Sequence, residues 1–382
     1  MNSPSPSVPQ QLPTLCPPPP ANFPRLRIKA EPEDFVVEEL PLYEPGGSGT
    51  HTYFWIEKRG LNSHDAVRRI AEVLGKRAAD GGLAGLKDAR AVSRQWISFE
   101  HVKEGLDKAA AIQDEKLRVL KVSSHGNKLK MGHLRGNRFI IRLRPIADCG
   151  LQIAYWQQPV LDRAIIVFET LSRKGIPNYF GEQRFGRGGN NAALGKLLVQ
   201  GDVPGFEAAA KAAGVRFQDR KLRNLLVNAF QSELFNQILS RRMPDIGRIE
   251  AGDLACLHRN GAVFAVATAE DAQREQPRAD AFEISPSGPL FGEKSILAEG
   301  RPGEIERDVL AASEVKAADF SRREAERQPG ARRSLRIAFL EPPETSRDES
   351  GILLRFALPS GAYATVVLNE IMGQNNGQPV LD

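Results

Sequence analysis

A single carboxylate, Asp88, lies among cations in a short polar turn. Lys87 precedes it, Arg90 and Arg94 follow it, and the apolar run QWISF at 95–99 then predicts a strand. Positive charge nearby favours the ionised form of a carboxyl group, and Arg90 is the candidate partner that keeps Asp88 charged. Such a carboxylate can act as a nucleophile or a general base on a polyanionic substrate. By residue type alone, an aspartate in a turn is more often a cap or turn residue.

The residues around Asp88 form a motif that adds to this interpretation. GLKD followed by AVSRQW resembles the catalytic motif of the TruD family of tRNA pseudouridine synthases, in which the aspartate is the catalytic residue. Four further blocks are similar to those of the family, in the same order: EDFVVEELPLYEPGGSGTHTYFWIEKRG at 33–60, MGHLRGNRFIIRLR at 131–144, IPNYFGEQRFGRGGNN at 176–191 and LLRFALPSGAYATVVLNEIM at 353–372. The resemblance therefore extends over residues 33–372, nearly the whole chain.

The reaction that the resemblance implies breaks the bond between C1′ and N1 of uridine and rejoins the base through C5. It needs an ionised carboxylate and neither oxidant nor transferred group, so we expect no cofactor and no metal. The sequence contains no P-loop, no GxGxxG and no HExxH spacing. Asp88 could add to the base, add to C1′ or remove a proton from the sugar, and the sequence leaves these three routes open.

A uridine in folded RNA must leave its stack before it can react, and an aromatic surface with an amide nearby can hold the base. Asn137 and Phe139 are two residues apart in a predicted strand and so point the same way. The resemblance gives these two positions the base contacts, and it places Lys29 and Phe35 at further active-site positions. By residue type alone, the two phenylalanines could equally be core residues and Lys29 a solvated strand residue.

Two basic features suggest contacts with phosphates. Arg184 lies in the glycine-rich segment NYFGEQRFGRGGNN, where glycines allow close approach and arginine can pair with phosphate, although a tight turn between domains is as good an interpretation. Between Lys116 and Arg144 there are nine Lys or Arg residues and no Asp or Glu, which is typical of an RNA-binding surface or of a solvated face. Alternation with apolar residues predicts that this run forms a basic hairpin of two strands, each with one buried face.

Composition sets the remaining limits. The net charge of +5 decides little, and 382 residues favour two domains. Cys16, Cys149 and Cys256 are too widely separated to predict a disulfide framework or a thiolate zinc site. No apolar run is long enough for a membrane span, and the N-terminus does not resemble a secretory signal. We therefore expect a cytoplasmic protein that does not bind membranes.

The elements that must position these residues indicate an α+β fold. Residues 1–24 contain nine prolines and are predicted to be a disordered tail, with order beginning near Arg25. Helices are predicted at 65–77, after a cap at Asn62 or Ser63, at 159–175 starting at Pro159, and through much of 190–242, where Leu225 belongs to an apolar stripe. LRIAFL, ILLRFALP and AYATVVLNEI, all after residue 334, are predicted to be strands that rejoin the first sheet.

The sequence thus predicts a catalytic domain with a mixed, largely antiparallel sheet, formed by residues 25–174 and 339–382. The resemblance implies a pseudouridine synthase core and, at 175–338, the mostly helical α+β inserted domain of the family. It also implies that the target is uridine 13 in the D-arm of tRNA. We infer no protein partner and prefer a monomer. The alternatives are a non-catalytic RNA-binding protein of the same fold, pseudouridylation of another RNA, or an enzyme that acts on a small molecule.

Overall fold

The computed structural model describes residues 12–87, 91–102, 104–146, 153–214 and 220–373. Asp88 and Arg90, the first two residues on which the predicted chemistry depends, lie outside the described residues, as does Cys149. Contacts among the described residues divide the chain into two compact units. The sheet unit is drawn from Pro19–Glu169, Phe339–Ala364 and Ile371–Asp382, and the helical unit from Met1–Pro18, Thr170–Ala338 and Thr365–Glu370. The domain limits proposed from the sequence stay a prediction.

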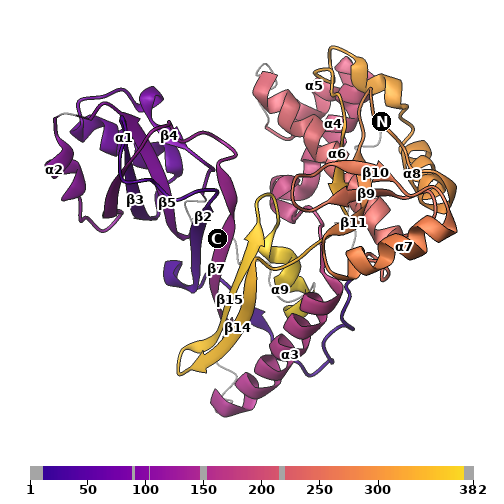
Figure 1. The fold of residues 1–382 in the computed structure, drawn as a ribbon, viewed down its shortest axis with the longest axis horizontal. Helices are drawn as coiled ribbons and strands as arrows, with labels where there is room; N and C mark the ends of the chain where they lie inside the picture. The colour runs from indigo at the N-terminus through magenta and orange to yellow at the C-terminus, as the bar shows by residue number, and fades with distance from the viewer. Residues whose placement is uncertain (1–11, 88–90, 103, 147–152, 215–219, 374–382) are drawn as a thin grey trace. The chain divides into compact units, whose positions relative to one another are not determined.

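A mixed sheet of nine strands forms the sheet unit, as the described residues show (Figure 1). Its strands β2 and β5 are parallel, and the other pairs are antiparallel. This confirms the predicted α+β class with a largely antiparallel sheet. In spatial order the strands are β14 (Glu341–Asp348), β15 (Gly351–Pro359), β7 (Leu134–Pro145), β2 (Phe35–Pro41), β5 (Val92–Glu100), β3 (His51–Arg59) and β6 (Leu117–His125), while β1 (Leu26–Arg27) pairs with β7 and β4 (Gly82–Leu83) with β5.

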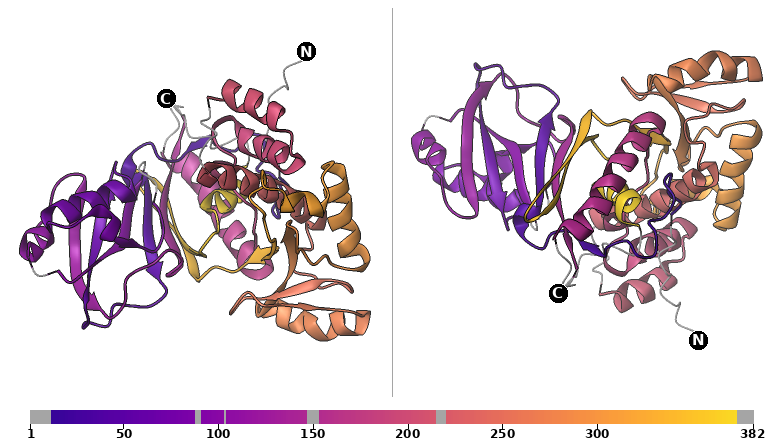
Figure 2. Two further views of the ribbon diagram at one scale, coloured as in Figure 1. Left: turned by 90° about the horizontal axis from the view of Figure 1, so that it is seen from above. Right: turned by 90° about the horizontal axis from the view of Figure 1, so that it is seen from below.

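Helix α1 (Ser63–Val73) covers one face of this sheet (Figure 2). Its N-cap is Asn62, whose side chain accepts a hydrogen bond from the backbone N–H of Asp65, as predicted. The helix buries Val67 and Ile70 against apolar side chains of β3 and β5, including the fully buried Phe54 and Phe99. The short helix α2 (Leu106–Ala110) adds Ala109 to the same cluster. This packing holds α1 against the two strands that flank the segment preceding Asp88.

The predicted basic hairpin does not form. Strand β6 lies at the edge of the sheet beside β3, whereas β7 lies between β15 and β2, so that β2, β5 and β3 separate the two strands. Alternation along a strand predicts which residues share a face, but it does not identify the neighbouring strand. The connection at 126–133 instead crosses the sheet unit, fixed by the buried Leu129.

Two predicted element boundaries are wrong. Helix α3 (Ile153–Lys174) begins before Pro159, which lies inside it. The preceding turn is stabilised by tertiary packing, since Trp156 is buried and the Gln157 amide donates to the carbonyl oxygen of Asp348 at 2.7 Å. The predicted tail is also packed from residue 12 on. Cys16 is buried, and its backbone N–H donates to a carboxylate oxygen of Glu370 at 2.9 Å, so order begins before Arg25.

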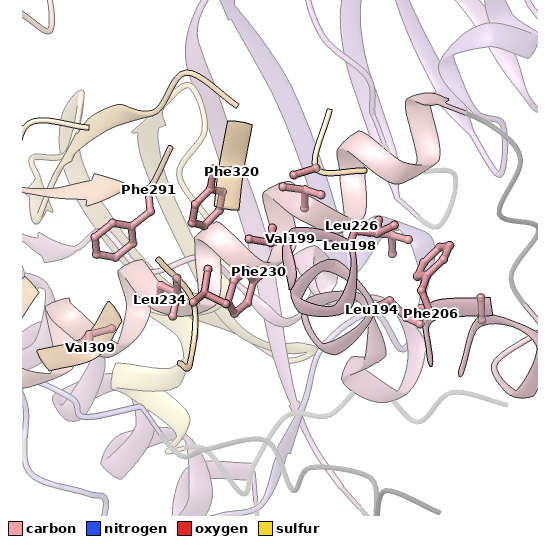
Figure 3. Close-up of a cluster of buried hydrophobic side chains, with 14 of the residues drawn as sticks. Leu194, Leu198, Val199, Phe206, Leu226, Phe230, Leu234, Phe291, Val309 and Phe320 are labelled. Carbon is pink, nitrogen blue, oxygen red and sulfur yellow. The ribbon is translucent and has the colours of Figure 1, made fainter. Parts of the chain in front are cut away.

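The helical unit contains α4 (Asn190–Gln200), α5 (Val203–Ala212) and α6 (Arg220–Arg242), as the sequence predicts. Figure 3 shows the apolar side chains that these helices bury, among them Phe230 and Leu234, together with Phe320. Leu225, which was expected in this core, is 43% exposed. The unit also contains α7 (Ala269–Asp280), α8 (Gly300–Ala312), and a sheet in the order β10 (Val263–Ala265), β9 (Leu254–Leu257), β11 (Ile284–Leu290) and β12 (Ala331–Ser334).

The last part of the chain differs from the prediction in two places. Within LRIAFL only β13 (Arg336–Ile337) is a strand, and it pairs with β8 (Ile176–Pro177) instead of the large sheet. AYATVVLNEI forms helix α9 (Ala364–Met372) and not a strand. Its β-branched residues favour a strand, but the segment is buried on nearly all sides, at 364, 366–368 and 370–372, so packing outweighs local propensity. Strand β15 confirms the prediction made for ILLRFALP.

Candidate active site

The backbone immediately before Asp88 is fixed by three buried side chains. The backbone N–H of Lys87 donates to Oγ of Ser63 at 2.9 Å, and its carbonyl oxygen accepts from Nζ of Lys58 at 3.2 Å. Ser63 in turn donates to Oε1 of Gln95 at 2.8 Å. Lys58, Ser63 and Gln95 are all nearly inaccessible to solvent. These contacts from β3, α1 and β5 hold the approach to Asp88 in one position, although Asp88 itself lies outside the described residues.

The Lys87 side chain joins two further polar groups. Its Nζ donates to Oδ1 of Asn137 at 2.7 Å and lies 3.7 Å from Oε2 of Glu39, a distance too long for a hydrogen bond. The other oxygen of Glu39 accepts from the backbone N–H of Trp96 at 3.3 Å. Glu39 and Asn137 are directly opposite each other on β2 and β7. The predicted amide at Asn137 is therefore tied, through Lys87, to the residue that precedes Asp88.

Burial controls the charges of this pair. It raises the pKa of Glu39 to about 7, although the Lys87 cation and the Trp96 N–H oppose the change. Burial also lowers the pKa of Lys87, and there Glu39 opposes it. A carboxyl group with a pKa near neutrality can exchange protons at physiological pH. The arrangement thus places a second titratable acid close to the segment that carries Asp88.

An aromatic group lies on the same strands. Phe35 and Phe139 are both buried, with ring centroids 6.3 Å apart in an edge-to-face arrangement. Phe139 also stacks on Phe356 of β15, with centroids 5.6 Å apart. Nζ of Lys29 lies 4.4 Å from the centre of the Phe35 ring, and Lys29 has a left-handed backbone with φ 59°. The structure therefore brings Lys29, Phe35 and Phe139 together. Asn137 lies two residues before Phe139 on β7.

Two predicted cations make other contacts. The Arg94 guanidinium pairs with Glu38 and Glu57. By strand alternation, the neighbouring Gln95 occupies the inward position of β5. Arg184 belongs to the helical unit, where its Nε donates to Oγ of Ser232 at 3.2 Å and its guanidinium lies 5.6 Å from the centre of the Phe180 ring.

Comparison with known proteins shows the family to which this chain belongs. The sequence profile of tRNA pseudouridine synthase D (TruD) matches residues 25–219 and 206–371. This chain belongs to the TruD family. The tRNA pseudouridine synthase D of Geobacter metallireducens is 38% identical over 92% of this chain and 95% of its own length, and that of Anaeromyxobacter dehalogenans is 42% identical over 90% and 92%.

A solved TruD fold is similar to the whole structure. The crystal structure of a Methanosarcina mazei protein named as a tRNA pseudouridine synthase D (TruD) matches with a TM-score of 0.71 and 24% identity. The match covers 92% of this chain and 93% of that one. The α+β fold is thus that of a TruD protein.

Sequence reasoning missed four side chains around Lys87, the residue before Asp88: Lys58, Ser63, Gln95 and Glu39. A weak signal existed for Glu39, since it lies four residues after Phe35 in DFVVEEL and so shares its strand face. A charged residue on an inward face must be paired or change its pKa. Lys58 at the same kind of position in HTYFWIEKR is fully buried. The sequence could not show that both act on the backbone or side chain of Lys87.

Two kinds of feature are absent from the described residues. No group of three or more His, Cys, Asp or Glu side chains in this part of the chain is placed to hold a metal ion. None of the helices within the described ranges is long and apolar enough to cross a membrane.

Proposed function

We propose that this chain isomerises uridine to pseudouridine in tRNA at uridine 13 of the D-arm, with Asp88 as the reacting carboxylate and with neither metal nor cofactor. The observation that carries the proposal is the match to TruD along both parts of the chain, together with the GLKD motif. The buried hydrogen bonds to Ser63 and Lys58 support it, since they fix the residue before Asp88. A catalytic group needs such fixed supports to stay in a productive position.

The proposed roles follow from the chemistry of each side chain. Asp88 adds to the base, adds to C1′ or removes a sugar proton, and Arg90 keeps it ionised. Asn137 hydrogen-bonds the detached base, which rests beside Phe35 and Phe139, while Lys29 supplies positive charge at the edge of this group. The Lys87 ammonium orients the amide of Asn137, because it occupies one lone pair of Oδ1 at 2.7 Å. Arg184 binds a phosphate of the RNA.

The test uses tRNA labelled with tritium at C5 of uridine. Formation of the new bond at C5 releases the label, so wild-type protein should release tritium and Asp88→Asn should release none while still binding tRNA. Asp107→Asn is the matched control, since this aspartate of the sheet unit is exposed and forms no ion pair among the described residues. It should act as wild type does. Full release by Asp88→Asn would remove Asp88 from its proposed role.

The same assay tests the target position and the alternatives. A tRNA with cytidine in place of uridine 13 should release no label, and continued release would show that another uridine reacts. A non-catalytic RNA-binding protein would bind tRNA without any release. An enzyme for a small molecule would show no salt-dependent affinity for tRNA.

We also propose that the protein works in the cytoplasm as a monomer. The proposed substrate, tRNA, supports the location, and the presence of both units in one chain supports the monomer. Sedimentation of the purified chain with and without tRNA tests the second point, and a stable dimer would contradict it.

A further inference from the structure

A hollow of about 540 Å³ opens in the sheet unit at the segment that connects β6 to β7. Sites for small ligands commonly have about 300–1,000 Å³, so a nucleotide-sized group can enter. The lining is polar and aromatic, and it includes Tyr43, His51, His125, Lys128, Lys130 and His133. No carboxylate contributes to the lining as the described residues form it. A hollow with this composition favours an anion.

The two lysines are held by a firmly anchored segment. Leu129, between them, is 3% exposed and packs in a cluster with Tyr53, Ala84 and Trp96. Its backbone N–H donates to Oγ of Ser98 at 3.0 Å. Lys128 and Lys130 therefore flank a fixed point. No ion pair involves either lysine among the residues that the structure describes, which leaves both ammonium groups available for a ligand.

The other wall of the hollow depends on a glycine. Gly49 has φ +128°, and a Cβ there would lie 2.4 Å from the carbonyl carbon and oxygen of His125. Only glycine allows this loop to close on His125. As a result, the backbone N–H of Gly46 donates to Nδ1 of His125 at 3.2 Å. A neutral ring that accepts at Nδ1 carries its proton on Nε2, so the ring retains a donor for a ligand.

Tyr43 adds a flat surface to these donors. Its ring stacks on His125 with centroids 4.9 Å apart and planes at 22°, and its hydroxyl lies 2.6 Å from Nδ1 of His133. Aromatic rings of this kind hold nucleic acid bases by stacking. The hollow thus combines a stacking surface, which suits a base, with two ammonium groups and imidazole donors, which suit its phosphate.

We propose that this hollow binds a nucleotide of the RNA substrate other than the reacting uridine, with its phosphate at Lys128 and Lys130 and its base against Tyr43. The proposal rests on the proposed function. Tyr43 is four residues after Glu39, at most about 14 Å along an extended chain. One RNA strand can therefore reach both the hollow and the active site. Gly132, in the same connection, also donates to the carbonyl oxygen of Ala84 at 3.0 Å, just before the catalytic segment.

The first test measures tRNA affinity as a function of salt concentration for the full chain. Lys128→Ala/Lys130→Ala should bind about tenfold more weakly, with the slope of log K against log salt smaller by about 2, since each phosphate contact contributes about 1. The matched control is Lys116→Ala/Lys121→Ala, which removes the same charge from exposed positions of the same basic run. Equal losses in the two double variants would overturn the proposal.

The second test separates stacking from charge. Tyr43→Ala should weaken binding by about tenfold or more, as expected from the loss of one stacked base, and Tyr43→Phe should restore it because the ring is kept. Equal affinity of the alanine variant and wild type would contradict the base contact. Since both readouts measure binding, they stand even if wild-type protein releases no tritium. Conversely, if wild-type protein releases tritium and all the variants bind tRNA with unaltered affinity, only the proposal for the hollow is refuted.

The third test distinguishes RNA from a free nucleotide. The ring signals of His125 and His133 should shift in NMR spectra when tRNA is added, and UMP should cause the same shift only at far higher concentration. If UMP saturates these signals at lower concentration than tRNA does, the hollow is a site for a free nucleotide and the proposal is wrong.

Discussion

At the scale of single residues, burial changes the charges of Glu39 and Lys87 beside the proposed catalytic segment. Glu39 has no exposed surface in its side chain, and Lys87 has little, so neither charge is solvated. Lys87 nevertheless donates to Asn137 and helps to place the proposed base-binding amide. A buried pair of this kind contributes little to net stability. We therefore attribute its presence to positioning and to proton exchange near neutral pH.

The raised pKa of Glu39 predicts how stability depends on pH. The native state favours the protonated acid, so this contribution is fully present below about pH 4.5 and is lost as the pH rises through 7. A shift of this size corresponds to a loss on the order of 3 kcal/mol. Glu39→Gln has no such proton to lose. We therefore compare the free energies of unfolding of wild type and Glu39→Gln. The difference, wild type minus variant, should fall by this amount between pH 4.5 and pH 8.

Urea unfolding followed by tryptophan fluorescence measures this difference. All three tryptophans, at positions 55, 96 and 156, belong to the sheet unit that contains Glu39. Glu344→Gln is the control, because this residue of β14 is exposed. A pH-independent difference between wild type and Glu39→Gln would show that Glu39 does not carry the raised pKa.

At the scale of elements, helix α1 directly supports Lys87, the residue before Asp88. It buries one face against β3 and β5, and its first residue, Ser63, binds the backbone N–H of Lys87 and the side chain of Gln95. The sequence predicted a cap at Asn62 or Ser63 and the apolar face, because both depend on local spacing. It could not show the contact between Ser63 and Lys87, which are 24 residues apart, since that contact depends on how the helix docks.

The same limit explains the other differences between prediction and structure. Asn137 and Phe139 could be placed on one strand face because they follow strand alternation, whereas Phe35 could be named only because the TruD motif marks it. The neighbours of β6 and β7 could not be predicted, since pairing is set by the order of the whole sheet. Helix α9 has the local composition of a strand, and only its packing identifies it as a helix. Local pattern thus predicted faces, and tertiary packing decided partners.

We predict that Ser63→Ala impairs catalysis through the backbone. It leaves the buried N–H of Lys87 without an acceptor and Oε1 of Gln95 without the Ser63 donor, which costs about 1–3 kcal/mol of stability. A looser approach to Asp88 should lower kcat for tritium release while KM for tRNA stays the same. Ser350→Ala, at an exposed position of the same unit, is the control. A wild-type kcat in Ser63→Ala would mean that this hydrogen bond does not position the catalytic segment.

At the scale of the whole molecule, the net charge of +5 conceals an uneven distribution of cations. Of the nine cations between Lys116 and Arg144, four have carboxylate partners: Arg118, Arg138, Arg142 and Arg144. The other five, at positions 116, 121, 128, 130 and 135, have no ion pair within the described part of the chain. The paired arginines are therefore expected to stabilise the sheet. Of the other five, Lys128, Lys130 and Arg135 are expected to attract RNA, and Lys116 and Lys121 to be solvated surface residues.

Two substitutions, each of which removes one positive charge, separate these roles. Arg142→Gln removes contacts to Asp348 and to the buried Asp34, so it should cost about 2 kcal/mol of stability and leave the salt dependence of tRNA binding unchanged. Arg135→Gln, at an exposed position, should reduce the slope of log K against log salt by about 1 and change stability by less than about 0.5 kcal/mol. Tryptophan fluorescence in urea measures the first quantity, and fluorescence anisotropy with labelled tRNA measures the second. If Arg142→Gln reduced the slope as much as Arg135→Gln, ion pairing would not be what divides this basic run, and the RNA would have to displace Asp348 from Arg142 on binding.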